Sequence, residues 1–543
     1  MATKQNGNGS FQHVRFALMA SVIAASMLFT TGMASAADPD DGNPDLSVSW
    51  NNTVGYTLGI RAQERRQYIV NSVAGGGDLK FDRGDINTSR LSLLSELVVK
   101  YKDNYGVRFS GDGWYDPAYS SSKAETNPIL GASGYADDRF SGYVERYYKG
   151  PSAELLDAYA FGNFLIGDVP VSLRAGRHTQ YWGEALFSNT YAVSYSQSPI
   201  DGIKGTTNPG AEVKTLFLPL ASLSLQSQLT PSVSVGAQYF LEWKPTRLPA
   251  GGTYFGAVDF LFDGPNQLPV PGGNPLPKLA PSEPGNYGNF GLNAQWTVEP
   301  LQTKFGVYYR KFDDYMPWGA PEVTASGYRL VYPRNTQLLG ITAARDIAGA
   351  SVGAEISYRK NTALSPSAID PVSQQGPSGD TWNAVLNALW SLDKTRFYDT
   401  GSAILELTFN HLSAVTRNAA QFNGVGYGTC TDKWNSCATK NFVGLAYSFD
   451  PQWLQVFPSV DIDMPVFANY GLSGNAANNG GGFQGSTTYS AGVNFKFRGQ
   501  YDLSLLYEGF HARSDQVGSV VRNNGNVAYN DKGAVFLTFK AGF

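Results

Sequence analysis

This 543-residue sequence has little of what metal, redox and nucleic-acid chemistry require. It contains only two cysteines, and its four histidines lie far apart in sequence, so we expect no metal and no cofactor. If Lys4 and Arg15 are removed with an exported leader, 39 of the 41 basic residues remain against 45 acidic ones, which argues against nucleic-acid binding. After residue 37, no apolar run approaches the roughly 18 residues of a membrane-spanning helix.

The first 36 residues have the order of a secretory signal. Lys4 and Arg15 are their only charges, an apolar run covers residues 16–29, and a small-residue triplet ends at Ala36. This order predicts a signal peptide at 1–36 with cleavage after Ala36. The alternative is an amino-terminal membrane anchor, for which the apolar run is short. An exported chain of this composition is either a secreted soluble protein or an outer-membrane barrel.

The two cysteines, Cys430 and Cys437, are close neighbours in sequence. In an oxidising compartment such a pair most often forms a disulfide that closes a small loop. We therefore expect a Cys430–Cys437 disulfide.

The last eleven residues, 533–543, have the pattern of a single membrane-crossing strand. Apolar residues of one parity end on Phe543, and the other parity is small or polar except for Phe536. About ten residues with a period of two is the length of one tilted strand of an outer-membrane barrel. The terminal aromatic resembles the carboxy-terminal signal that the barrel assembly machinery reads. We expect Phe543 to be that assembly signal.

The same alternation recurs along the chain, with connections that are short and long in turn. This habit predicts an all-β fold, a transmembrane antiparallel β-barrel of about 18 strands (16 is possible), with short periplasmic turns and long extracellular or inward-folded loops. Residues 37–543 then form one barrel domain. The expected strands are 46–60, 91–101, 107–113, 155–166, 169–178, 212–227, 232–244, 287–297, 302–312, 335–344, 350–360, 381–391, 401–411, 441–449, 458–467, 487–498, 501–510 and 533–543.

Parity assigns the two faces of these strands. One parity is apolar and is expected to contact lipid, with Tyr and Trp at the strand ends. The other carries charges of both signs, which must face the lumen because a Lys or Arg facing lipid costs about 2–4 kcal/mol at the midplane. A lumen of mixed sign predicts no strong preference for anions or cations. The expected lumen charges are Arg108, Asp112, Arg174, Glu242, Lys244, Lys304, Arg310, Glu355, Arg359, Glu406, Asp461, Asp463, Lys496, Arg498, Asp502 and Glu508.

Three loops are long enough to carry function: 117–154, 179–211 and 245–286. Some of them are expected to fold inward and constrict the pore. The alternative is that they are solvated surface loops.

Several segments, in order, resemble one family across the whole mature chain: proteobacterial outer-membrane proteins catalogued as domain of unknown function thirteen-oh-two. The block from 155 to 259 is the most specific. The chain departs from the pattern at His178, where a Gln is expected, and near the carboxy terminus. The matching segments include Leu155–Tyr159, Leu173–Arg177, Tyr181–Glu184, Pro209–Lys214, Leu241–Trp243, Gly252–Phe255 with Asp259, Tyr332–Pro333, Gly353–Arg359 and Gly379–Trp382.

The resemblance implies a role in moving small hydrophobic or amphiphilic solutes at the outer membrane of a Gram-negative bacterium. It also implies partners, because such proteins are usually encoded beside a periplasmic lipoprotein-like protein and a resistance-nodulation-division (RND) type transporter. Beyond these, we expect contact with outer-membrane lipid and the barrel assembly machinery, and none with nucleic acid. Fold-level analogy of this kind does not identify a site.

Charged residues of the expected strands and loops are the candidates for a lumen constriction. Arg174, Glu212, Lys214 and Glu242 are expected to point inward from three consecutive strands, whereas Arg177 is assigned to the loop that follows. One interpretation is that these charges anchor an inward-folded 179–211 loop. The other is that they are structural ion pairs in a half-filled barrel. The full set of candidates is Arg174, Arg177, Glu184, Glu212, Lys214, Glu242, Glu355 and Arg359.

Five aromatic residues, Tyr143, Tyr147, Tyr148, Tyr181 and Trp182, are candidates to line an entry path for an apolar solute. Interfacial anchoring or loop packing is the alternative.

A transport barrel is the preferred interpretation, and two others stay open. An outer-membrane lipid hydrolase would need a serine and a histidine, and His411 and His511 lie near serines, but neither stands beside a Gly-x-Ser-x-Gly turn. We expect no catalytic residues. A structural or adhesin-like surface barrel would explain the long loops.

Overall fold

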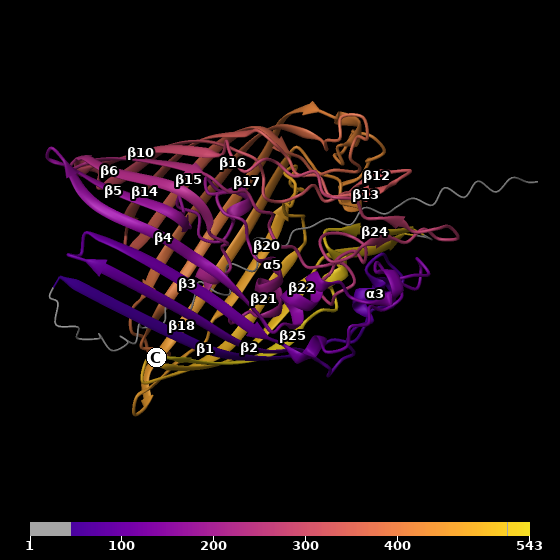
Figure 1. Ribbon diagram of the computed structural model, residues 1–543, viewed down its shortest axis with the longest axis horizontal. Helices are drawn as coiled ribbons and strands as arrows, with labels where there is room; N and C mark the ends of the chain where they lie inside the picture. The colour runs from indigo at the N-terminus through magenta and orange to yellow at the C-terminus, as the bar shows by residue number, and fades with distance from the viewer. Residues whose placement is uncertain (1–44, 518–519) are drawn as a thin grey trace, which may run out of the picture.

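The computed structural model describes residues 45–517 and 520–543 (Figure 1). The expected signal peptide at 1–36 lies outside the described residues. No helix in the described part of the chain is long and apolar enough to cross a membrane. Cys430 and Cys437 are joined by a disulfide, with their Cα atoms 5.9 Å apart.

The dominant element is one antiparallel sheet that closes on itself. Each strand pairs with the strands before and after it, and the ring closes where the first strand pairs with the last, with Tyr56 opposite Phe539. The two short strands Val460–Asp463 and Val466–Ser473 are separated by Met464 and Pro465. Together they count as one strand of the barrel wall. The predicted fold is thereby confirmed as a closed 18-strand antiparallel barrel.

The barrel strands are β1 (Leu46–Arg61), β2 (Ile86–Tyr101), β3 (Tyr105–Tyr115), β4 (Ser152–Ile166), β5 (Val169–His178), β6 (Leu220–Thr230), β7 (Val233–Phe240), β10 (Phe290–Val298), β11 (Thr303–Phe312), β14 (Thr336–Ile347), β15 (Ala350–Ala363), β16 (Ser378–Leu392), β17 (Thr400–Arg417), β18 (Asn441–Phe457), β19 (Val460–Asp463), β20 (Val466–Ser473), β21 (Thr487–Phe497), β22 (Tyr501–His511) and β25 (Ala534–Gly542). Outside the barrel, the described residues form three small hairpins, which lie in loops. They are β8 (Gln267–Leu268) with β9 (Leu276–Pro277), β12 (Glu322–Thr324) with β13 (Gly327–Arg329), and β23 (Arg513–Val517) with β24 (Val520–Asn524).

The helices are short and all lie in loops. They are α2 (Gln67–Val70), α3 (Gly75–Asp78), α4 (Gly142–Val144) and α5 (Gly202–Thr207), with single turns η1 (Pro117–Tyr119), η2 (Ala136–Asp138), η3 (Glu145–Lys149), η4 (Asn189–Tyr191), η5 (Val213–Thr215), η6 (Glu299–Leu301), η7 (Ala419–Gln421), η8 (Lys433–Asn435) and η9 (Val527–Tyr529).

Strand β11 shows how the period of two builds two faces. Val307 is 51% exposed on the outside of the barrel, while its neighbours Tyr308 and Arg310 are almost completely buried inside. In transmembrane β-barrels, apolar side chains that face lipid alternate in the same way with polar side chains that face the lumen. The outer surface of this sheet is therefore the surface of a protein seated in a bilayer.

Connections at one end of the barrel are short and at the other end long. In Figure 1 the short turns and the carboxy terminus lie toward the left, and the long loops, with α3, β12, β13 and β24, lie toward the right. We call these the turn end and the loop end. Turns such as Ala348-Gly349 at the turn end adopt positive φ, +82° at Gly349, which a residue without a Cβ accommodates without strain.

The long loops at the loop end share one hydrophobic core, which we call the aromatic cap. Asp259 ties its loops together by accepting hydrogen bonds from the backbone N–H groups of Gly76 (2.6 Å) and Gly77 (2.9 Å) and from the Asn127 amide (2.6 Å). Asp259 therefore joins the loops 62–85, 116–151 and 241–289 at the loop end. The main rings of the cap belong to Phe81, Tyr119, Tyr135, Phe140, Tyr148, Tyr254, Phe255 and Tyr529.

Strand boundaries were predicted wrongly at β6 and β7. The expected strand 212–227 begins only at Leu220, after Pro219, whose nitrogen has no N–H to donate. Leu216 and Leu218 continued the alternation in sequence because they are buried inside the barrel, not because they belong to a strand. Glu212 and Lys214 therefore do not project from a strand.

The assignment of faces predicts that a strand tolerates a charged side chain on its lumen face but not on its lipid face. Ile341, in the middle of β14, is 53% exposed on the lipid side. Ile341→Lys should lower the free energy of unfolding in lipid vesicles by about 2–4 kcal/mol. Gln295 is a matched control at the same depth. It is next in sequence to Ala294, which pairs with Val307, and Val307 pairs in turn with Ile341.

Gln295 faces the lumen. Gln295→Lys should leave the free energy of unfolding nearly unchanged in the same denaturant titration. Equal losses for the two variants would contradict the assignment of faces.

Candidate functional site

The chain between β5 and β6, residues 179–219, enters the barrel, and we call it the inward segment. From Phe187 to Ala211 every residue except Ser198 and Gly202 is buried. Figure 1 places α5, which belongs to this segment, within the outline of the strands. Many of its residues are Ser, Thr, Gly, Ala or Asn, small enough for the chain to pass close to the barrel wall. The inward segment therefore fills part of the lumen.

Two buried arginines of the wall hold the backbone of the inward segment. Arg310 of β11 donates to the carbonyl oxygens of Val193 (2.9 Å), Tyr195 (2.6 Å) and Ser196 (2.8 Å). Arg359 of β15 donates to those of Thr190 (2.8 Å) and Ala192 (2.9 Å). A guanidinium carries five N–H donors in a rigid fork, so one side chain can satisfy several carbonyl groups of an irregular chain.

Two wall carboxylates bind the N–H groups of the same stretch. Glu406 of β17 accepts from Leu186 (2.6 Å), Phe187 (3.1 Å) and Ser188 (2.7 Å). Glu355 of β15 accepts from the backbone of Glu184 (3.1 Å) and Val193 (3.2 Å). Backbone polar groups buried without a partner are costly, and these charges supply partners where no secondary structure does.

The second half of the inward segment is tied to the opposite wall. Lys204 of α5 forms a 2.6 Å ion pair with Asp112 of β3. Glu212 pairs with Lys540 of β25 at 2.9 Å, and Lys214 pairs with Glu96 of β2. Because the first half is held by β11, β15 and β17, the inward segment crosses the lumen from one wall to the other.

Arg247, from the loop 241–289, joins this network at the loop end. Its guanidinium forms a bidentate pair with Glu154 of β4 (3.1 and 2.6 Å) and a 2.7 Å bond with Asp201 of the inward segment. Burial alone would raise the pKa of Asp201, but Arg247 and Lys204 outweigh it and hold the pKa below its ordinary value. The aromatic cap and the inward segment are thus fastened to each other.

Among the predicted constriction residues, Glu355 and Arg359 bind the inward segment directly. Glu212 and Lys214 were wrongly placed on a strand, yet they bind the wall from within the inward segment. Glu184 lies there too, and its backbone is the part that Glu355 binds. Arg310 and Glu406 were expected only as lumen charges. Each of the two is a long charged residue in the middle of an expected strand, with lipid-facing residues on both sides. This position is the feature of the sequence that could have indicated their role.

Arg177 and Glu242 do not contribute to the constriction. Arg177 lies within β5, not in the loop as predicted, because the strand continues to His178. Its guanidinium pairs with Glu242 at 2.6 Å, and Glu242 pairs with Lys244 at 2.8 Å. Glu242 and Lys244 follow the end of β7 at Phe240, so this trio lies at the loop-end rim and not on inward-facing strand positions.

The predicted aromatic residues divide between two places. Tyr143, Tyr147 and Tyr148 lie in α4 and η3 and pack in the aromatic cap, where the Tyr148 hydroxyl accepts from the Ala250 N–H at 2.9 Å. This matches the loop-packing alternative. Trp182 is buried against Tyr308, and Tyr181 is 45% exposed toward the lumen.

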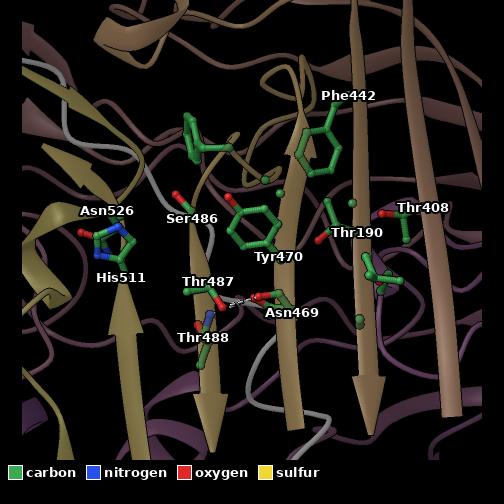
Figure 2. Close-up of a pocket in the computed structure, with 18 of the residues that line it drawn as sticks. Thr190, Thr408, Phe442, Asn469, Tyr470, Ser486, Thr487, Thr488, His511 and Asn526 are labelled. Carbon is green, nitrogen blue, oxygen red and sulfur yellow. Dashed lines mark hydrogen bonds between the residues drawn. The ribbon is translucent and has the colours of Figure 1, made fainter.

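Within the described residues, the inward segment borders at least two cavities. One, of about 100 Å³, lies between Thr190 of the inward segment and strands β17, β18, β20, β21 and β22. Figure 2 shows Phe442 and Tyr470 among its lining residues, and a hydrogen bond from the Thr487 hydroxyl to Asn469, 2.5 Å to the backbone oxygen. We call it the aromatic pocket, because rings and hydroxyl groups are both among its lining.

The second cavity, of about 370 Å³, is polar, and we call it the turn-side cavity. It lies between residues 179–182 of the inward segment and the wall strands β5, β6, β7, β10 and β11. Lys304, one of its lining residues, is the second residue of β11 after the short turn that precedes this strand. The cavity therefore opens on the turn-end side of the inward segment.

The two histidines weighed for hydrolysis lie at strand ends. His411 shares a 2.6 Å hydrogen bond with Asn441 and stacks on Phe409, and His511 lines the aromatic pocket. Within residues 45–517 and 520–543, no hydrogen bond joins either ring to a serine or an aspartate.

Comparison with known proteins gives a family and distant structural neighbours. A family model described as Protein of unknown function (DUF1302) matches residues 17–543. No curated protein matches the sequence. Among solved structures, Acinetobacter baumannii OccAB4 is similar at 9% identity and TM-score 0.41, over 91% of this chain and 98% of that one. Pseudomonas aeruginosa OpdK, solved with vanillate, is similar at 9% identity and TM-score 0.40, over 91% and 98%.

The anchoring of the inward segment can be tested at Glu406. In Glu406→Ala, three buried N–H groups lose their acceptor, at a cost of about 1–3 kcal/mol per unsatisfied group. Hydrogen–deuterium exchange in peptides that contain Leu186–Ser188 should accelerate strongly, while exchange in the barrel strands stays slow. Glu299→Ala, in the exposed turn η6, is the control and should change nothing. Unchanged protection of Leu186–Ser188 in Glu406→Ala would show that the carboxylate does not hold the segment.

Proposed function

The chain belongs to this family, and we propose that it is an outer-membrane channel through which small amphiphilic or hydrophobic solutes diffuse passively. The observation that carries the proposal is the inward segment, held across the lumen of a lipid-seated barrel by charges of the wall. A barrel with a merely structural role has no use for a constriction built from at least four buried charged side chains. A channel does, because a constriction sets which solutes pass.

The character of the solute is inferred from the cavities that border the constriction. The aromatic pocket offers the faces of Phe442 and Phe483 beside the hydroxyl groups of Thr190 and Thr408. Aromatic surfaces with a few fixed polar groups suit a small molecule that has an apolar body and a polar end. The turn-side cavity is polar and lies beyond the inward segment. Such a path favours amphiphilic solutes over purely apolar ones.

The partners follow from the resemblance and are part of the proposal. A periplasmic lipoprotein and an RND-type transporter would meet the channel at its turn end, where solute leaves or enters the lumen. Phe543 lies at this end, with its backbone bonded to Asn52 and its side chain 60% exposed. An exposed terminal aromatic is available to the barrel assembly machinery.

Conductance in planar bilayers tests the channel and its constriction together. The wild-type protein should conduct in small steps. In the double variant Arg310→Ala/Arg359→Ala, five carbonyl groups lose their donors, so the inward segment should leave the wall and the conductance should rise severalfold. Arg345→Ala, at an exposed position of β14, is the matched control and should conduct like wild type. A correctly folded wild-type barrel that neither conducts nor admits solute in liposome swelling would refute the proposal.

The class of solute is tested in cells. A deletion strain should grow more slowly on hydrophobic or amphiphilic carbon sources and normally on others. Altered surface integrity with unchanged growth on every carbon source would favour a structural role instead.

A further inference from the structure

Two positive charges lie in the turn-side cavity. Arg174 of β5 and Lys304 of β11 both line it, and both are exposed to its interior. In the part of the chain that the structure describes, neither takes part in an ion pair. The recorded contact of Arg174 is with the ring of Tyr159, 5.8 Å from the guanidinium carbon.

Elsewhere in the lumen, basic residues bind carboxylates, or backbone carbonyl groups as Arg310 and Arg359 do. Arg108 of β3 is bonded to Glu96 (2.6 Å) and Asp157 (3.1 Å). Lys496 of β21 is bonded to Asp463 (2.8 Å). Against this background, Arg174 and Lys304 are an exception that structural ion pairing does not explain.

The nearest acid to consider is Glu184 of the inward segment. Burial raises the pKa of its carboxyl group, and Lys304 opposes that shift, so the two groups sense each other. No ion pair joins them within the described residues, and Glu184 is not among the residues that line the cavity. The positive charge of the cavity is therefore not cancelled by the inward segment.

The remaining lining residues are suited to an oxygen-rich ligand. Gln226, Asn293 and Gln295 bring side-chain amides from β6 and β10, and Tyr181 brings an aromatic ring from the inward segment. The volume of about 370 Å³ is within the range of small-molecule sites. An arginine fork recognises the two oxygens of a carboxylate, and a lysine adds a point charge to the same anion.

Three inward-facing acids lie on an arc of the wall away from the cavity. Asp450, Asp463 and Asp502 belong to β18, β19 and β22, whereas the cavity is bordered by β5, β6, β7, β10 and β11. The charges of Arg174 and Lys304, exposed in the cavity, raise the local concentration of anions there.

We propose that the turn-side cavity binds the carboxylate of a small organic anion, with Arg174 and Lys304 holding the carboxylate and the amides of Gln226, Asn293 and Gln295 bonding its other oxygen substituents. The inference rests on the proposed function and narrows its solute class to amphiphiles that carry a carboxylate. Tyr181 contacts the apolar part of such a solute, so the site distinguishes an acid from a neutral molecule of the same shape.

Benzoate and benzyl alcohol form a suitable pair of probes, because they share a ring and differ in charge. Benzoate added to the turn-end side of a single channel should interrupt the current, and benzyl alcohol should not. Isothermal titration of the detergent-solubilised protein measures the same binding without relying on conduction. In Arg174→Gln/Lys304→Gln, affinity for benzoate should fall about tenfold to hundredfold, because glutamine replaces each charged hydrogen bond by a weaker neutral one.

Two further variants separate charge recognition from damage to the fold. Arg174→Lys keeps the charge but loses the fork, so its affinity for benzoate should lie between those of wild type and the double variant. Arg345→Gln removes a charge outside the cavity and should bind as wild type does. Heat-modifiable migration on gels confirms that each variant is folded.

The outcomes distinguish the inference from the proposed function. If the channel conducts but benzoate and benzyl alcohol bind equally weakly in both assays, the carboxylate site is wrong and the channel stands. If the protein does not conduct yet binds benzoate through Arg174 and Lys304, the site stands and the channel is wrong. Unchanged benzoate affinity in the folded double variant would also overturn the inference.

Discussion

The structure depends on one constraint, which is that every backbone N–H and C=O group removed from water must find a partner. In lipid, a strand can meet it only by pairing on both sides, so the sheet has to close. Inside the barrel, the inward segment meets the same constraint without regular secondary structure over most of its length. Arg310, Arg359, Glu355 and Glu406 take the place that neighbouring strands have elsewhere. The charged side chains of the wall therefore act mainly as hydrogen-bonding partners of the inward segment.

This constraint explains which parts of the molecule could be predicted from sequence. A period of two is imposed on each strand by lipid on one side and the lumen on the other, so strands such as β11 and β25 could be recognised from their own residues. The same alternation predicted that charges such as Arg310 and Glu406 face the lumen, although Glu242 and Lys244 lie at the rim. Nothing in that pattern says what each charge binds, since the partners are backbone groups more than one hundred positions away.

The errors have the same origin. Leu216 and Leu218 are buried inside the barrel by contact with other inward-lying residues, and this reproduces locally the alternation of a strand. For Tyr143 and Tyr148 the sequence left a solute path and loop packing both open, because aromatic residues in loops have two common uses, lining a site and filling a core. Which use applies is decided by tertiary neighbours such as Ala250, and a single sequence does not reveal them.

The anchoring of the inward segment also bears on how the protein is assembled. The segment is made after the fifth strand, yet its partners include Lys540 of the last strand and Glu406 of β17. Until those strands arrive, its exposed amides and carbonyls must stay hydrated or be shielded by other molecules. Seating of the segment is therefore a late event, coupled to the moment when the first and last strands join. A chain that stalls before that moment has an unpaired strand edge, and the backbone groups of its inward segment lack their hydrogen-bonding partners. Both features can be recognised by the cell's protein quality control.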